Sequence, residues 1–222
     1  MDGVIDIEDA RALTGDGRLW PLARDFLWNF ATQVHPSWLD GLGGLASPRM
    51  RAYALSRLGV EPCFHKFPSD DCSRIILLDA ATMDAVAKWL GALACSDSLR
   101  RIMDGATVRG LKAALPGVYP DVFGYTMYFT QFLAKHSAQA KCADDVLAAG
   151  PRILLSLFAS LPRNLVSRVQ FKFPKDSPFA AAVADFASGG SGTAEDGYTE
   201  LKAAVLKLLK LKFPEAYLLC CS

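Results

Sequence analysis

Residues 75–115 read IILLDAATMDAVAKWLGALACSDSLRRIMDGATVRGLKAAL and carry the clearest helical pattern in the chain. Asp79 is a natural N-cap, and one apolar stripe follows it at helical spacing. The stripe consists of Met83, Val86, Ala87, Leu90, Leu93 and Ala94. Because such a stripe must be buried, the stretch predicts the central helix of a helical core.

Two shorter helices are expected to follow this central helix. The first should restart at Ser96 or Asp97, and it should bury one face made of Leu99, Ile102 and Met103. Thr107 should open the second, which turns Val108 and Leu111 inward and stops at Pro116 and Gly117. Short corners between these helices predict antiparallel neighbours with mostly local contacts.

Other helix starts are marked by a capping residue or a proline. We expect helices from Ser47-Pro48 to Gly59, after Pro120-Asp121, from Pro151 to Pro162, and from Ser177-Pro178. The first should share a face of Met50, Tyr53, Ala54 and Leu58, and the second should be largely buried. Residues 75–78 are expected to begin as a short extended piece. Residues 163–173 fit either a helix or a strand, and we expect helix turning extended toward Phe173-Pro174.

These patterns predict a mainly α protein. We expect a single compact, irregular domain of about eight helices over residues 19–222. One short extended segment near residues 167–174 is an alternative to helix there. Residues 1–18 mix acids and glycines and predict a poorly ordered lead, and the SGGSG run predicts a mobile loop near residues 188–197. No apolar run is long enough to span a bilayer and no signal peptide is visible, so a cytoplasmic location is expected.

Motifs for catalysis or cofactor binding are missing from the sequence. The formal net charge is +1, which gives no overall field toward nucleic acid. Cys63, His65, Asp70, Asp71 and Cys72 have irregular spacing, and a structural loop is favoured over a metal site. No GxSxG, HExxH or nucleotide-binding loop occurs, so we expect no catalytic residue, no metal and no cofactor.

Two surfaces stand out as candidates for contact with a partner. Arg100, Arg101, Arg109 and Lys112 form a modest basic group at one end of the core helices, and arginine pairs well with carboxylates at interfaces. A solvated face is the simpler interpretation of these charges. The last helix has Leu201, Val205, Leu208 and Leu209 on one side and four lysines around the other: Lys202, Lys207, Lys210 and Lys212. Docking of this helix on its own domain is favoured over a partner or lipid surface.

Several stretches together resemble one known family. They are HPSWL at residues 35–39, RLG at residues 57–59, LLDAATMDAVAKWLGALACSDSLRRIMDGATVRGLKAAL, and SRVQFKFP at residues 167–174. From about Phe26 to the C-terminus the chain is similar to the SctK family, also called YscK, PscK or HrpB4-like. Its members are cytoplasmic sorting-platform components of bacterial type III secretion systems.

The resemblance implies a non-enzymatic adaptor at the cytoplasmic face of the inner membrane. SctK proteins link the cytoplasmic forkhead-associated-like domain of the ring protein SctD to the SctQ pods, which carry SctL and the export ATPase. By motif position, His35, Pro36, Ser37, Trp38, Arg100 and Arg101 match family landmarks, and these with Arg109 and Lys112 are the candidate partner-binding residues. For Trp38, plain core packing is the simpler interpretation. Contact with the membrane is expected only through a partner.

Two other function classes stay open at this level. One is a regulatory or membrane-surface protein that acts through the basic C-terminal helix. The other is a helical enzyme that uses a cysteine such as Cys63, Cys72 or Cys142.

Overall fold

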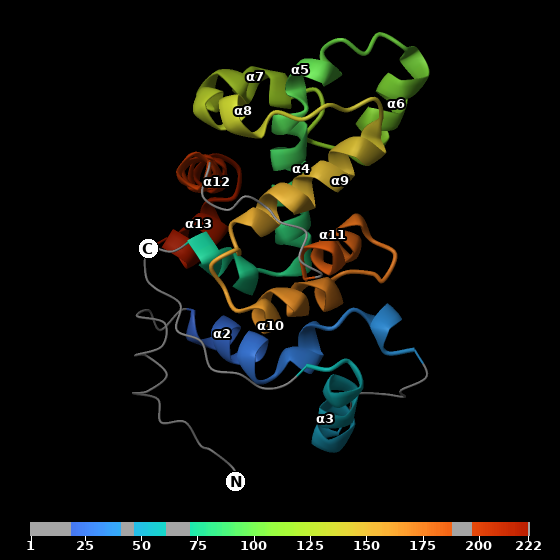
Figure 1. The fold of residues 1–222 in the computed structure, drawn as a ribbon, viewed down its shortest axis with the longest axis vertical. Coiled ribbons are helices and arrows are strands. Elements are labelled where there is room, and N and C mark those ends of the chain that lie inside the picture. The colour runs from blue at the N-terminus through green and yellow to red at the C-terminus, as the bar shows by residue number, and fades with distance from the viewer. Residues whose placement is uncertain (1–18, 41–46, 61–71, 188–196, 222) are drawn as a thin grey trace.

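A computed structural model of the chain describes residues 19–40, 47–60, 72–187 and 197–221 (Figure 1). Within these ranges every regular element is a helix, which confirms the mainly α fold. The predicted lead over residues 1–18 and most of the loop predicted near residues 188–197 lie outside the described residues. The division of the chain into a lead and one domain therefore stays a prediction.

Several of the helices are single turns, and 3₁₀ turns (labelled η) connect them, so the described elements outnumber the eight predicted helices. The first half contains α2 (Trp20–Leu27), η1 (Phe30–Gln33), η2 (Pro36–Trp38), α3 (Pro48–Arg57), η3 (Cys72–Leu77), α4 (Ala80–Ala94), α5 (Ser96–Leu99) and α6 (Gly105–Ala114). The second half contains α7 (Val122–Tyr125), η4 (Thr126–Tyr128), α8 (Thr130–His136), α9 (Ala143–Ser156), α10 (Arg163–Val166), η5 (Ser167–Lys172), α11 (Pro178–Ala187), α12 (Tyr198–Lys212) and α13 (Pro214–Cys221).

Helix α4 forms the centre of the molecule, as its apolar stripe predicts, and α9 crosses it at a pair of glycines. A Cβ atom on Gly91 would overlap the Val146 carbonyl and lie 2.9 Å from the Gly150 nitrogen. A Cβ atom on Gly150 would overlap the carbonyl of Ala87. The two backbones therefore approach so closely that any side chain at either glycine has no space.

The start of α4 is capped as predicted, whereas the start of α6 is not where we expected it. The Asp79 carboxylate accepts hydrogen bonds from the Thr82 amide at 2.9 Å and the Thr82 hydroxyl at 2.8 Å. Asp104, not Thr107, caps α6, and its carboxylate accepts from the Thr107 amide and hydroxyl, both at 2.7 Å. Thr107 was a plausible cap by residue type, but an ionised aspartate three residues earlier binds the free amides better.

The prediction for Met103 was wrong. Leu99 is buried and Ile102 is half-buried, but Met103 is 92% exposed. Helix α5 ends at Leu99, so residues 100–104 no longer continue its face. Met103 therefore projects into solvent from the loop after α5 instead of packing against the core.

The start predicted at Pro151 was also wrong, because α9 begins eight residues earlier, at Ala143. The Asp145 carboxylate accepts from the backbone amides of Lys141 at 2.7 Å and Cys142 at 3.2 Å, and these bonds lower its pKa. Acidic residues in the first turn favour that start. Pro151 lies inside the helix, where the missing amide costs one hydrogen bond beside the close contact with α4.

Residues 163–172 are helical throughout, and the open alternative of a strand near residues 167–174 was wrong. The alternation of apolar and polar residues suggested a strand with one face in solvent. Arg168 and Lys172 are instead buried together with Val169 and Phe171, so the polar positions do not mark a solvent face. A lone strand would also lack a partner, since the described part of the chain contains no other strand. Phe173 alone adopts extended angles, as expected before Pro174. Residues 72–77 likewise form η3 instead of a short extended piece.

The aromatic segment after Pro120 is less buried than predicted. It breaks into α7, η4 and α8, and Met127 is 70% and Tyr128 is 53% exposed. Only Val122, Phe129 and Phe132 of this segment are fully buried. Its apolar residues do not share one stripe, so a single helix could not bury them all.

The C-terminal helix α12 packs its apolar face onto the body, as favoured from the sequence. Leu201, Val205, Leu208 and Leu209 are buried. Two of its lysines also hold the α7–α8 segment, because the Lys207 ammonium donates to the Tyr128 carbonyl at 2.9 Å and the Lys212 ammonium lies 4.2 Å from the Tyr125 ring centre. Helix α13 follows α12 and begins at Pro214.

Candidate interaction surfaces

The HPSW motif at residues 35–38 docks onto the end of η5 and the residues that follow it. The His35 amide donates to the Phe171 carbonyl at 2.7 Å, and the Trp38 indole nitrogen donates to the Phe173 carbonyl at 2.7 Å. The Lys175 amide donates to the Ser37 hydroxyl at 3.2 Å. Two stretches that carry the family resemblance, residues 35–39 and 167–174, therefore meet in space although they are far apart in the chain.

Trp38 is held mainly by its own protein. Its ring packs edge-on against Phe171 at 4.9 Å between centres, and the Lys175 ammonium lies 5.6 Å from its ring centre. The imidazole of His35 bonds back to the Ser37 hydroxyl at 2.9 Å, and Pro36 is exposed. The motif thus joins the N-terminal part of the chain to residues 171–175, and the simpler interpretation of Trp38 as a packing residue fits these contacts.

The basic group at residues 100–112 is only partly available to a partner. The Arg100 guanidinium donates to the Thr126 hydroxyl at 2.8 Å and lies 5.5 Å from the Phe123 ring centre, so it fastens α7 to the end of α5. Arg101, Arg109 and Lys112 are exposed, and the structure gives them no ion pair within the described residues. These three and Met103 are exposed side chains of α6 and of the loop that leads into it, and we call them the α6 patch.

Helix α3 is largely exposed, with one buried residue among its ten. Ser47 caps it through its hydroxyl, which accepts from the Met50 amide at 3.2 Å, and Gly59 follows it with a φ of 66°. These details confirm the predicted start and end. The face predicted from Met50, Tyr53, Ala54 and Leu58 packs only in part, because Ala54 is buried and Leu58 is half-buried against the core, whereas Tyr53 is 51% exposed. Helix α3 lies at one end of the long axis of the molecule, and α5 and α6 lie at the other (Figure 1).

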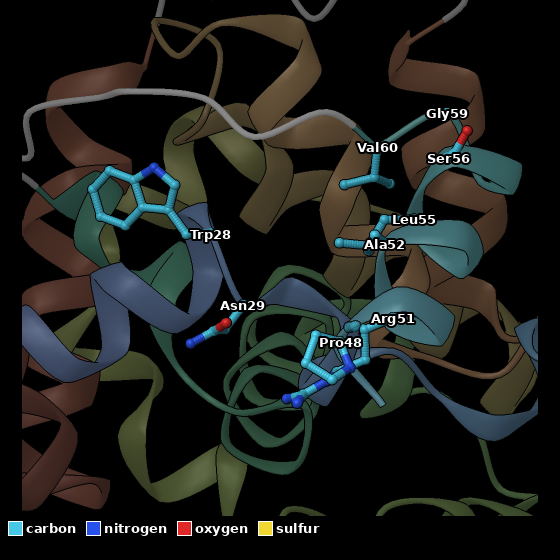
Figure 2. A pocket seen from close by; sticks show the side chains of 10 residues that line it. Trp28, Asn29, Pro48, Arg51, Ala52, Leu55, Ser56, Gly59 and Val60 are labelled. Atoms are coloured by element: carbon cyan, nitrogen blue, oxygen red, sulfur yellow. The ribbon is translucent and has the colours of Figure 1, made fainter. Parts of the chain in front are cut away.

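A groove of about 490 Å³ separates α3 from the aromatic end of α2. Figure 2 shows Trp28 and Asn29 on one wall and the side chains of α3 on the opposite wall. Its lining is mostly apolar and consists of Trp28, Asn29, Ala31, Pro48, Arg51, Ala52, Leu55, Ser56, Gly59 and Val60. The Trp28 ring is half-buried and packs 5.5 Å from Trp20, so this wall is a fixed aromatic surface.

Arg51 is the one charged side chain among the described residues that line this groove. Within the described ranges its guanidinium makes no hydrogen bond or ion pair, whereas the nearby Arg24 is paired with Asp25 at 3.0 Å. We call this feature the α3 groove. Nothing in the sequence predictions singled it out, although the signal was present: Ser47 to Val60 contains three arginines and no acid.

Residues 24–121 match the model of a protein family described as YOP proteins translocation protein K (YscK). This match confirms the predicted family resemblance. It covers somewhat less than half of the chain, and it includes the HPSW motif, the α3 groove and the α6 patch. Neither the search of curated proteins nor the search of solved structures found a match.

The YscK family belongs to type III secretion. The described residues show no cluster suited to metal binding. No group of three histidine, cysteine or acidic side chains comes together within the described ranges. Burial raises the pKa of the Cys95 thiol to about 11, which keeps it protonated and unreactive. Cys63, His65, Asp70 and Asp71, which were considered as metal ligands, lie outside these ranges. Among the described helices, none has both the length and the apolar character to cross a membrane.

Proposed function

We propose that this protein is a non-enzymatic cytoplasmic adaptor of a type III secretion sorting platform. It links the cytoplasmic domain of an SctD-like ring protein to an SctQ-like pod protein, and through the pod to SctL and the export ATPase. The observation that carries the proposal is the position of the two open surfaces. The α3 groove and the α6 patch lie at opposite ends of the long axis, and both fall within the residues matched to the YscK family.

The interior of the molecule supports a mechanical role. The glycine crossing of α4 and α9 fixes the central helices backbone to backbone, and buried Arg168 and Lys172 tie η5 to α2 and η3. A body held in this way keeps its two ends at a fixed separation. An adaptor needs this property, because it sets the distance between the ring and the pod.

The packing of helix α12 argues against the alternative of a membrane-surface protein. Its apolar face is buried against the body, so it is not free to enter a lipid interface without unfolding from its own core. Lys207 and Lys212 are engaged with the aromatic residues of α7 and η4.

Binding to the two partners from the same organism tests the proposal. We expect the purified full chain to bind an SctD-like cytoplasmic domain and, separately, an SctQ-like protein in calorimetric titrations. The double variant Arg101→Glu, Arg109→Glu should weaken one of these interactions by about tenfold, because reversed charges on the α6 patch repel the carboxylates that it attracts. The double variant Arg163→Glu, Lys210→Glu reverses two exposed charges on α10 and α12, outside the patch, and is the matched control. If the double variant binds both partners as tightly as the wild type, the α6 patch is not a binding surface.

A further inference from the structure

The α3 groove combines an apolar trough with an excess of positive charge. Its walls carry Trp28, Pro48, Leu55 and Val60, and Arg51 is the one charged residue of its lining within the described part of the chain. Arg49 and Arg57 add to the charge of the same helix, and residues 47–60 contain no acid to balance them. The opposite wall offers Asn29, which is neutral, and Asp25 is already paired with Arg24.

The geometry of α3 separates its arginines into two groups. Residues 48, 51, 52, 55, 56 and 59 recur every three to four positions and form the stripe that faces the groove. Arg51 belongs to this stripe. Arg57 lies two residues from both Leu55 and Gly59, which places it about half a turn away, on the back of the helix. Of the three arginines of α3, Arg51 therefore faces the groove and Arg57 lies on the opposite side of the helix.

We propose that the α3 groove binds an acidic segment of a partner protein, which inserts a large apolar side chain beside Trp28 and sets a carboxylate against Arg51. The inference rests on the proposed function, since the partner is one of the two proteins that the adaptor links. Complementary charge selects the partner, and burial of the apolar side chain against the indole supplies affinity. Two helical elements with an apolar trough between them are a common receptor for such a segment.

Charge reversal of the two arginines tests the inference in the intact protein. Arg51→Glu should weaken binding to one of the two proposed partners by about tenfold or more and leave the other partner within about twofold. Arg57→Glu makes the same change on the back of α3 and should leave both affinities within about twofold. Circular dichroism melting of both variants verifies that the fold is kept. If Arg51→Glu and Arg57→Glu behave alike while the wild type binds both partners, the inference is wrong and the proposed function stands.

A crosslinking experiment identifies the occupant directly. A photoreactive p-benzoylphenylalanine replaces Ala52, an exposed residue that lines the groove, and the same group replaces Tyr53 as a control outside the lining. With purified partner present, mass spectrometry should find the Ala52 crosslink in a partner peptide that is rich in aspartate or glutamate and contains a large apolar residue. A crosslink to residues 1–18 of the same chain, or none to the partner, would overturn the inference. If the wild type binds neither partner, the proposed function fails and the inference fails with it.

Discussion

At the scale of single residues, buried cations are the least expected feature of this protein. Arg168 is 2% exposed, and its guanidinium donates to the carbonyls of Phe26 at 2.7 Å and Leu27 at 3.0 Å, the last residues of α2. These carbonyls have no partner within the helix, and the arginine also compensates the negative end of the helix dipole. Arg168 is therefore a C-terminal cap supplied from a distant part of the chain.

Replacing Arg168 should cost more stability than replacing any exposed arginine. We expect Arg168→Leu to lower the free energy of unfolding by about 3 kcal/mol, because two buried carbonyls lose their donors. Arg163→Leu, an exposed arginine a few residues earlier, should change it by less than about 0.5 kcal/mol. Urea denaturation followed by circular dichroism measures both. Equal effects of the two substitutions would contradict the capping role.

Lys172 predicts a pH dependence of stability. Its ammonium donates to the carbonyls of Ile76 and Leu78, both at 2.8 Å, and burial lowers its pKa from 10.5 to about 7 against the attraction of the Asp79 carboxylate. Below pH 7 the folded and unfolded chains both hold the proton, so this group adds no pH dependence. Above pH 7 only the unfolded chain keeps it. Stability should therefore rise with pH until the unfolded lysine titrates, by at most about 1.4 kcal/mol per pH unit.

Denaturation of the wild type and of Lys172→Met between about pH 6.5 and 9.5 measures this dependence. The substitution removes the titrating group, so the free energies of the two proteins should diverge as the pH rises. Parallel pH profiles would show that Lys172 keeps its proton in the folded state over this range.

The sequence predicted residue roles well where the signal is local. The caps Asp79, Ser47 and Ser177 follow from residue type and position, and all three hydroxyl or carboxylate groups accept the expected amide. Arg168 and Lys172 act on carbonyls about a hundred residues away or more, and no local pattern encodes such contacts. The exposure of Met103 was missed for a related reason, since it depends on where α5 stops.

At the scale of elements, the crossing of α4 and α9 carries the fold. Gly91 and Gly150 bring the two backbones into contact, and Pro151 comes directly after Gly150 within α9. Periodicity predicted α4 but could not reveal that a glycine in each helix marks a crossing point. The start of α9 was predicted at Pro151 because the apolar residues begin there, although the polar residues that cap the helix come earlier.

Alanine substitutions at two helical glycines should have opposite effects. Gly150→Ala should destabilise the protein by about 3 kcal/mol, because its methyl group would overlap the Ala87 carbonyl and force the helices apart. Gly110→Ala in α6 should stabilise it by about 0.5 to 1 kcal/mol, since nothing lies within 4 Å of the added methyl group and alanine favours the helix. Thermal melting distinguishes the two. An unchanged stability of Gly150→Ala would show that the two helices can move apart to accommodate the methyl group.

At the scale of the whole molecule, the sequence predicted the helical class and the family resemblance, and it singled out the basic residues of the α6 patch but not the α3 groove. Of the eight candidate residues, His35, Ser37, Trp38 and Arg100 are engaged in contacts within the chain, while Pro36, Arg101, Arg109 and Lys112 are exposed. The α3 groove was missed because a groove arises from two elements, and the sequence pattern describes each element alone. The separation of the two surfaces along the long axis becomes visible only when the helices are assembled (Figure 1).

The central claim is that one molecule of this protein holds two partners at once through separate ends. The most direct test mixes the full chain with the SctD-like cytoplasmic domain and the SctQ-like protein, and measures the mass of the resulting species by size-exclusion chromatography with light scattering. The account predicts a complex that contains all three proteins and is heavier than either pairwise complex. Displacement of one partner by the other, with only pairwise complexes present, would contradict it.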